Sequence, residues 1–211
     1  MIHNYNPPYL IKKIFNQFKW ETSNNKILLT FDDGPNPGIT DKILLTLKEH
    51  KISSLFFCVG TNVDQYKSLT KQVIDEGHVV GNHTFNHKLL IKLGKKDSLE
   101  EIARFNALLR EKLNYTIQYF RPPFGWFKFS MGKLMKKTGL TCVMWNLVTY
   151  DYHNDLEKVK FAVDNHLQSN SIIVLHDSSK TEKIIVDSIK YIVDKADERG
   201  FEFGVPNECL N

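Results

Sequence analysis

The sequence predicts an α/β protein in which helices cover a sheet of parallel strands. Along the 211 residues, short runs rich in β-branched and aromatic residues alternate with longer stretches that have the period of an amphipathic helix. About seven such strand and helix units follow one another, and this order is typical of a parallel sheet, either closed as a barrel or open and doubly wound. The length and the 42% hydrophobic content fit one domain with a substantial core.

The boundaries of these units follow from the residue types at their ends. Asp97 and Ser98, followed by Glu100, are typical of a helix start, and Gly77 and Gly200 are typical of helix ends. The expected strands are residues 26–31, 54–59, 78–81, 118–120, 141–147, 171–175 and 201–205. The expected helices are residues 40–50, 62–76, 98–113, 133–138, 156–168 and 182–199.

Residues 1–25 predict a separate N-terminal segment. Its apolar residues recur at helical spacing between lysines: Ile11, Ile14, Phe15 and Phe18. Such an amphipathic helix can close one end of a domain or lie on an anionic membrane surface. We favour packing on the domain over a membrane contact by residues 9–20, and we expect the domain itself to span residues 26–211.

Charge and composition exclude several classes of partner and site. The net charge of +4 is small, and the Lys and Arg residues are interspersed with acids, so no nucleic-acid-binding surface is predicted. Cys58, Cys142 and Cys209 form no Cys-x-x-Cys pair, so we expect buried or idle thiols and neither a disulfide framework nor a zinc ribbon. No apolar run is as long as a membrane span, and residues 1–25 lack a signal-peptide core. We expect a soluble monomer, cytoplasmic as the chain is given, or exported by a leader outside this sequence.

Two adjacent carboxylates, Asp32 and Asp33, follow the apolar run at residues 27–29. Side chains alternate along a strand, so both carboxylates face one site only where the strand ends, and Gly34 with Pro35 provides that end. Carboxylates this close resist joint ionisation unless a cation lies beside them. Residues 30–35 taken alone fit a metal site or a turn with solvated carboxylates about equally well.

A pair of histidines follows the third expected strand. His83 and His87 are four residues apart, close enough on one helical turn for both imidazoles to bind one ion, although histidine is also a common loop residue. Together with one carboxylate they make a set of two imidazoles and one acid. This count matches a catalytic zinc site, which keeps a fourth position open.

The fourth expected strand ends at Arg121, before Pro122 and Pro123. The two prolines fix the backbone, so the amides from Phe124 onward are held in one orientation that suits an oxyanion hole. Arg121 is expected to pair with whichever aspartate does not bind metal. Four aromatic residues nearby either stack on sugar rings or pack on the domain: Phe124, Trp126, Phe127 and Phe129.

His176 ends the sixth expected strand, where an aliphatic residue would be ordinary. A hydrogen bond from Asp151 would fix the tautomer of its ring and raise its basicity, and these properties suit a general acid.

In this order and context, five motifs of the chain resemble those of the polysaccharide deacetylases, the NodB-homology group or carbohydrate esterase family 4. The motifs are residues 30–35, His83-x-x-x-His87, residues 121–125, Asp151 and residues 174–176. The resemblance covers about residues 26–205 and implies a distorted (β/α) barrel of seven or eight units in a single domain. It also implies a metal-dependent hydrolase that removes acetyl groups from N-acetylated or, less strongly, O-acetylated carbohydrate.

The resemblance further implies a role for each residue. Asp33, His83 and His87 would bind one divalent metal ion, zinc first, with cobalt, nickel or iron as alternatives. Asp32 would be the general base oriented by Arg121, and His176 the general acid supported by Asp151. The Phe124 amide would hold the oxyanion. The substrate groove would be formed by Pro123, Trp126, Tyr152 and Leu175.

The chain departs from the family pattern at four positions. Phe124 replaces the usual Tyr, which removes a hydroxyl and keeps the backbone amide. Val148 and Tyr152 replace an Asp and a Trp in the fourth motif, so the groove wall differs, and Val174 replaces a Leu. These departures keep two alternatives open, a carbohydrate-binding protein that has lost catalysis and an amidohydrolase acting on a non-sugar amide.

Overall fold

The strands form one curled parallel sheet in the computed structural model, which describes residues 5–211. The strands are β1 Leu28–Asp32, β2 Leu55–Cys58, β3 Val79–Asn82, β4 Tyr119–Phe120, β5 Thr141–Cys142, β6 Leu147–Val148 and β7 Ile172–His176. Their order across the sheet is β5-β4-β3-β2-β1-β7-β6. Consecutive strands β5 and β6 therefore lie at the two edges, and the predicted distorted (β/α) barrel is confirmed with an opening between them.

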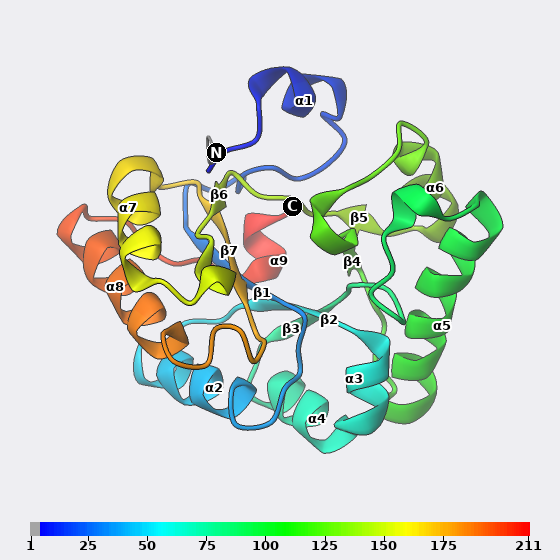
Figure 1. The fold of residues 1–211 in the computed structure, drawn as a ribbon, viewed down its shortest axis with the longest axis horizontal. Helices are drawn as coiled ribbons and strands as arrows, with labels where there is room; N and C mark the ends of the chain where they lie inside the picture. The colour runs from blue at the N-terminus through cyan, green and yellow to red at the C-terminus, as the bar shows by residue number, and fades with distance from the viewer. Residues whose placement is uncertain (1–4) are drawn as a thin grey trace.

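Helices surround the sheet, as Figure 1 shows. The longer ones are α2 Thr40–Glu49, α4 Lys67–Asp75, α5 Lys95–Leu113, α6 Met131–Thr138, α7 Leu156–His166 and α8 Ile185–Glu198. Shorter ones are α1 Tyr9–Ile14, α3 Gly60–Gln65, α9 Pro206–Cys209 and the 3-10 turns η1 Leu90–Lys92, η2 Pro123–Gly125 and η3 Asp151–His153. In Figure 1, α7 and α8 lie on the left, α5 and α6 on the right, and α1 at the top, while α9 lies near the middle.

The two faces of the sheet bury different residues because side chains alternate along each strand. Leu29 and Phe31 of β1 point toward the helices, whereas Leu28 belongs to a smaller interior cluster with Ile172 of β7. Cys209 of α9 and the following Leu210 join that interior cluster. The C-terminal helix therefore fills the inside of the barrel.

The N-terminal segment crosses the opening between the edge strands. Lys19 pairs in parallel with Val143, which follows β5, and the Val148 amide of β6 donates to the carbonyl of Tyr5. Phe15 and Phe18 are buried, whereas Ile14, which shares their sequence pattern, is 47% exposed. The division into a segment at residues 1–25 and a domain at residues 26–211 stays a prediction, and residues 1–4 lie outside the described part.

Three element predictions are wrong. The expected strand at residues 141–147 is two strands, because β5 pairs with β4 and β6 pairs with β7 at the other edge of the sheet. Between them, the carbonyls of Val143 and Met144 accept hydrogen bonds from Arg121. The expected strand at residues 201–205 is a single bridge between Ile27 and Phe203. The expected helix at residues 62–76 is broken at Tyr66 into α3 and α4.

The three cysteines are buried, and none of them forms a disulfide bond in the described residues. Within residues 5–211, no helix is both long and apolar enough to cross a lipid bilayer.

Candidate active site

The carboxyl ends of four strands bring the predicted polar residues together. Asp32 and His176 are direct partners in the pairing of β1 with β7. His83 and Arg121 directly follow Asn82 and Phe120, which pair across β3 and β4. A cleft of about 560 Å³ opens here, and eight of the predicted residues line it: Asp32, Asp33, His83, His87, Phe124, Trp126, Tyr152 and His176.

Asp33, His83 and His87 form a cluster with the donor set of a metal site. Their ligand atoms all lie within 4.8 Å of one another. Asp33 Oδ1 is 3.1 Å from His87 Nε2 and 3.7 Å from His83 Nε2. Zinc bonds of about 2.0–2.2 Å in a tetrahedron place neighbouring donors roughly 3.4 Å apart. The spacing and chemistry of the three residues therefore fit a divalent ion.

The protonation of His83 also fits metal binding. Its Nδ1 lies 2.8 Å from the carbonyl oxygen of Arg121, an acceptor that fixes the ring proton on Nδ1. Burial lowers the pKa of His83 to about 4, so the ring is neutral near pH 7. The lone pair of Nε2 therefore faces the cluster.

Asp33 remains a carboxylate although it is largely buried. Burial alone would raise the pKa of Asp33, but the hydrogen bond from His87 and the nearby charge of His176 hold it well below its usual range. The Asp33 carbonyl accepts a hydrogen bond of 2.8 Å from the Asn62 side chain, which fixes this turn on α3.

Arg121 fixes the position of Asp32. Its Nη1 donates to Asp32 Oδ1 and to Thr30 Oγ1, both at 2.7 Å, and its other nitrogens donate to the Val143 and Met144 carbonyls. The guanidinium carbon lies 4.2 Å from the ring centroid of Phe57. Arg121 is fully buried, so Asp32 has a rigid cationic partner behind it and one oxygen free to face the cleft.

Asp151 holds His176 by two contacts. Asp151 Oδ1 lies 2.7 Å from His176 Nδ1, and Asp151 Oδ2 accepts the His176 backbone amide at 2.6 Å. Burial alone would lower the pKa of His176, but the charge and hydrogen bond of Asp151 raise it to about 9. The ring is therefore protonated near pH 7, and its second nitrogen, Nε2, can donate a proton.

The Phe124 amide differs from the next two backbone amides in its hydrogen bonding. The Gly125 and Trp126 amides donate to carbonyls within that turn, at 3.0 and 3.3 Å. None of the backbone hydrogen bonds found in residues 5–211 uses the Phe124 amide as donor. The Phe124 ring, 61% exposed, packs against the His87 ring with centroids 4.6 Å apart.

Backbone strain is concentrated around the cleft. Five non-glycine residues there have a positive φ: Asp33, Thr84, His87, Phe124 and Tyr150. Such conformations are uncommon for non-glycine residues and cost on the order of 1–3 kcal/mol each. At Asp33 the positive φ turns the chain directly after β1, so two consecutive carboxylates reach the same cleft.

A buried carboxylate behind the cleft ties the loops after β1 and β7 together. The Asp177 amide donates to the Asp32 carbonyl at 2.7 Å, and Asp177 Oδ2 accepts from Thr40 Oγ1 at 2.6 Å. A Cβ on Gly34 would lie 2.2 Å from Asp177 Oδ2, so only glycine fits there. Burial raises the pKa of Asp177 to about 7. Asp177 belongs to none of the sequence motifs that predicted the site.

Two residues predicted for the groove, Leu175 and Pro123, do not line the cleft, and for Leu175 the reason is the alternation of side chains along β7. Leu175 is fully buried toward the helices, and Val174 lines the cleft in its place. Pro123 is buried beneath the turn. Trp145 and Lys180 line the cleft and were not predicted. Lys180 lies in the loop after the expected strand at residues 171–175, where polar residues are the usual signal, whereas Trp145 lies within the expected strand at residues 141–147.

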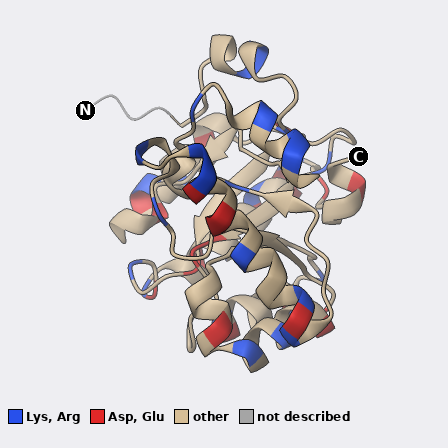
Figure 2. Cartoon of the chain, turned by 90° about the vertical axis from the view of Figure 1, so that its right-hand side faces the viewer, with Lys and Arg blue, Asp and Glu red and all other residues tan. Residues whose placement is uncertain are grey.

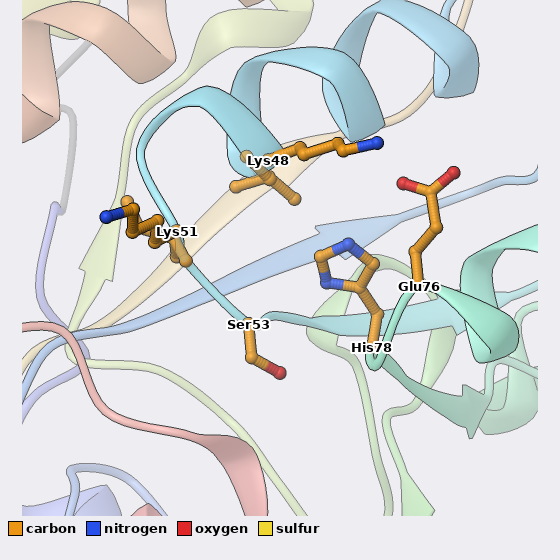
Figure 3. Close-up of a pocket in the computed structure, with 7 residues that line it drawn as sticks. Lys48, Lys51, Ser53, Glu76 and His78 are labelled. Atoms are coloured by element: carbon orange, nitrogen blue, oxygen red, sulfur yellow. The ribbon is translucent and has the colours of Figure 1, made fainter.

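A second pocket lies at the opposite ends of the strands, before β2 and β3. Figure 3 shows Lys48, Glu76 and His78 around it. The Nδ1 atom of His78 accepts the Ser54 amide at 3.2 Å. This histidine therefore supports the backbone at the start of β2 and lies away from the cleft.

Comparison with known proteins gives a family for the chain. The family model described as polysaccharide deacetylase matches residues 19–143, a stretch that includes Asp32 and Arg121 and ends before Asp151. A peptidoglycan-N-acetylglucosamine deacetylase of Bacillus cereus is 31% identical over 201 residues, which are 90% of this chain and 92% of that protein.

Solved structures give the same result for the fold. A peptidoglycan N-acetylglucosamine deacetylase in complex with 4-naphthalen-1-yl-N-oxidanyl-benzamide matches with a TM-score of 0.88 and 25% identity, over 96% of each chain. A carbohydrate esterase family 4 pseudoenzyme from Bacillus anthracis matches with a TM-score of 0.82 and 22% identity, over 91% of this chain and 68% of that chain. The second likeness concerns the fold alone, and it shows that this fold also occurs in a protein described as a pseudoenzyme.

Proposed function

The chain belongs to the polysaccharide deacetylase family, and on this premise we propose that it hydrolyses acetyl groups from N-acetylated carbohydrate. One observation carries the proposal: three groups meet in one cleft. They are the cluster of potential metal ligands, the Asp32 carboxylate held by Arg121, and the protonated His176. We propose an N-acetylglucosamine polymer as the substrate class, because the Bacillus cereus relative is named for that activity.

Asp33, His83 and His87 would hold a divalent ion, with zinc as the first choice for this donor set. Such an ion supplies Lewis-acid polarisation of the acetyl carbonyl. The residues around it then divide the proton transfers between them.

Asp32 is the general base in this proposal. It takes one proton from the water whose oxygen attacks the acetyl carbon, and Arg121 keeps its carboxylate in place. The Phe124 amide donates to the oxyanion that forms on the acetyl oxygen. His176 then gives the Nε2 proton to the sugar nitrogen as the C–N bond breaks, so acetate and a free amine leave.

The protonated state of His176 favours amides over esters. An amine leaves poorly unless it is protonated, whereas a sugar alkoxide needs less help. The Asp151 contact, which keeps the ring charged near pH 7, is therefore most useful for an N-acetyl substrate.

A panel of acetylated substrates tests this proposal. We would measure acetate release from chitooligosaccharides, peptidoglycan glycans, an O-acetylated sugar and a non-sugar amide, with Asp32→Asn as the inactive control. Preferential release from the N-acetylated sugars is expected. Tight oligosaccharide binding without release, whether zinc, cobalt, nickel or iron is supplied, would instead support a binding protein, and faster release from the non-sugar amide would support the amidohydrolase alternative.

A further inference from the structure

The N-terminal segment has two faces with different surroundings. Phe15 and Phe18 point inward and are buried against the barrel. Tyr9, Leu10 and Ile14 of α1 point outward and are 77%, 64% and 47% exposed. Figure 1 shows α1 standing out at the top of the molecule, away from the sheet. Closing the barrel therefore uses only one side of this segment.

A further exposed ring lies beside this segment, just before α6. Phe129 is 82% exposed, and its ring lies 5.5 Å from that of Phe15. Phe129 and Lys133 also border a groove of about 690 Å³ whose other side includes Gln17. We call the exposed side chains of Tyr9, Leu10, Ile14 and Phe129, with the lysines around them, the basic apolar face.

The two segments that carry this face contain basic residues and no acidic ones. Residues 5–20 and 126–141 contain seven lysines and no acidic residue. They are Lys12, Lys13, Lys19, Lys128, Lys133, Lys136 and Lys137. In Figure 2 the α1 ribbon at the top carries a blue segment and no red one. Glu21, which follows the segment, is close enough to raise the pKa of Lys12, although burial lowers that pKa overall.

We propose that the basic apolar face docks the protein on an anionic lipid membrane. Aromatic and aliphatic side chains on one side of a short helix, with lysines beside them, are typical of elements that lie in the membrane interface. Lysines near an anionic leaflet add electrostatic attraction. Leu10 and Ile14 offer no hydrogen-bonding group to a sugar, so a wall glycan is a poorer occupant than lipid.

Docking of this kind would also orient the cleft. One loop, residues 123–130, carries Trp126 at the cleft and Phe129 on the basic apolar face. A bound membrane would therefore lie beside one rim of the cleft.

Vesicle sedimentation tests the proposal on the full chain. Vesicles of phosphatidylglycerol mixed with phosphatidylcholine are compared with vesicles of phosphatidylcholine alone, at low and high salt. We expect binding only to the anionic vesicles, weakened by salt. The double variant Leu10→Ser/Ile14→Ser should lose it. Lys13→Glu/Lys133→Glu should weaken it by about 25-fold or more, since each basic residue near an anionic surface contributes about fivefold.

Matched controls come from α2, which lies on the side of the molecule opposite α1 in Figure 1. Leu45 is 60% exposed there and Lys48 is also exposed, so Leu45→Ser and Lys48→Glu should leave vesicle binding unchanged. Unchanged unfolding curves would show that all variants fold. Equal binding to neutral vesicles, binding to isolated wall glycan that Leu10→Ser/Ile14→Ser abolishes, dimerisation through Leu10, or no binding to vesicles at all would overturn the proposal. The readout is binding, so its outcome is independent of the proposed activity.

Discussion

At His176, two opposing effects set the charge of the ring. Burial disfavours the imidazolium, while the Asp151 carboxylate at 2.7 Å favours it, and the carboxylate prevails. Asp32 and His83 are each held in position by a partner behind them: the Arg121 guanidinium binds Asp32, and the Arg121 carbonyl oxygen binds His83. The residues that would act on substrate are therefore each fixed by a buried neighbour.

Replacing His176 by alanine should lower kcat on an N-acetylated oligosaccharide by roughly 10²- to 10⁴-fold, because one acid-base group contributes about that much. The measurement is steady-state acetate release, with His50→Ala at the end of α2 as the control. A decrease in kcat of less than tenfold in His176→Ala would show that His176 is not the general acid.

The pH dependence of kcat should change when the charge of Asp151 is removed. The acid form of His176 is required, so activity should fall as the pH rises through about 9. In Asp151→Asn the side chain keeps its shape and loses its charge, so the pKa of His176 falls and the alkaline limb of kcat should move to lower pH. If the alkaline limb does not move, the titration of a group other than His176 causes it.

At the scale of elements, strand ends and the loops after them position the site. The Asp177 side chain joins the loop after β7 to Thr40 at the start of α2, and Gly34 packs against its carboxylate. The β1 turn that carries Asp33 is thus held from behind.

Gly34→Ala should destabilise the protein by about 1–3 kcal/mol, since its Cβ would overlap the Asp177 carboxylate. In an Asp177→Ala background the same change should cost less, because most of the overlapping atoms are gone. Urea unfolding measures both. An equal cost of Gly34→Ala in both backgrounds would contradict this packing account.

The sequence predicted most strands and the location of the site, since hydrophobic runs and their polar ends are local signals. It could not predict the break after β5, because residues 141–147 are a nearly continuous apolar run. That break depends on Arg121 and Lys19, which are distant in sequence and bind the Val143 and Met144 backbone. The placement of Leu175 was predictable, since alternation along β7 assigns it to the face opposite His176.

At the scale of the whole molecule, the N-terminal segment covers the opening that the sheet leaves between β5 and β6. Phe18 packs among Phe15, Trp20 and Phe127, with ring centroids 5.3–6.3 Å away. The barrel is therefore completed by residues outside its strands, and this arrangement leaves the outer face of α1 for another partner.

Phe18→Ala should lower the free energy of unfolding by about 3–5 kcal/mol, the usual cost of removing a buried ring. Phe129→Ala, which removes a ring that is 82% exposed, should change it by less than about 0.5 kcal/mol. Urea denaturation compares the two. Equal small effects would mean that the segment does not contribute to the core.

We propose that one cation binds where Asp33, His83 and His87 meet, and that the activity depends on it. The most direct measurement removes metal with a chelator, adds zinc back in steps, and follows both bound metal and acetate release. We expect activity to disappear with the metal and to return as one ion binds per chain, with His87→Ala failing to regain either. Acetate release that is undiminished after complete metal removal would contradict the account.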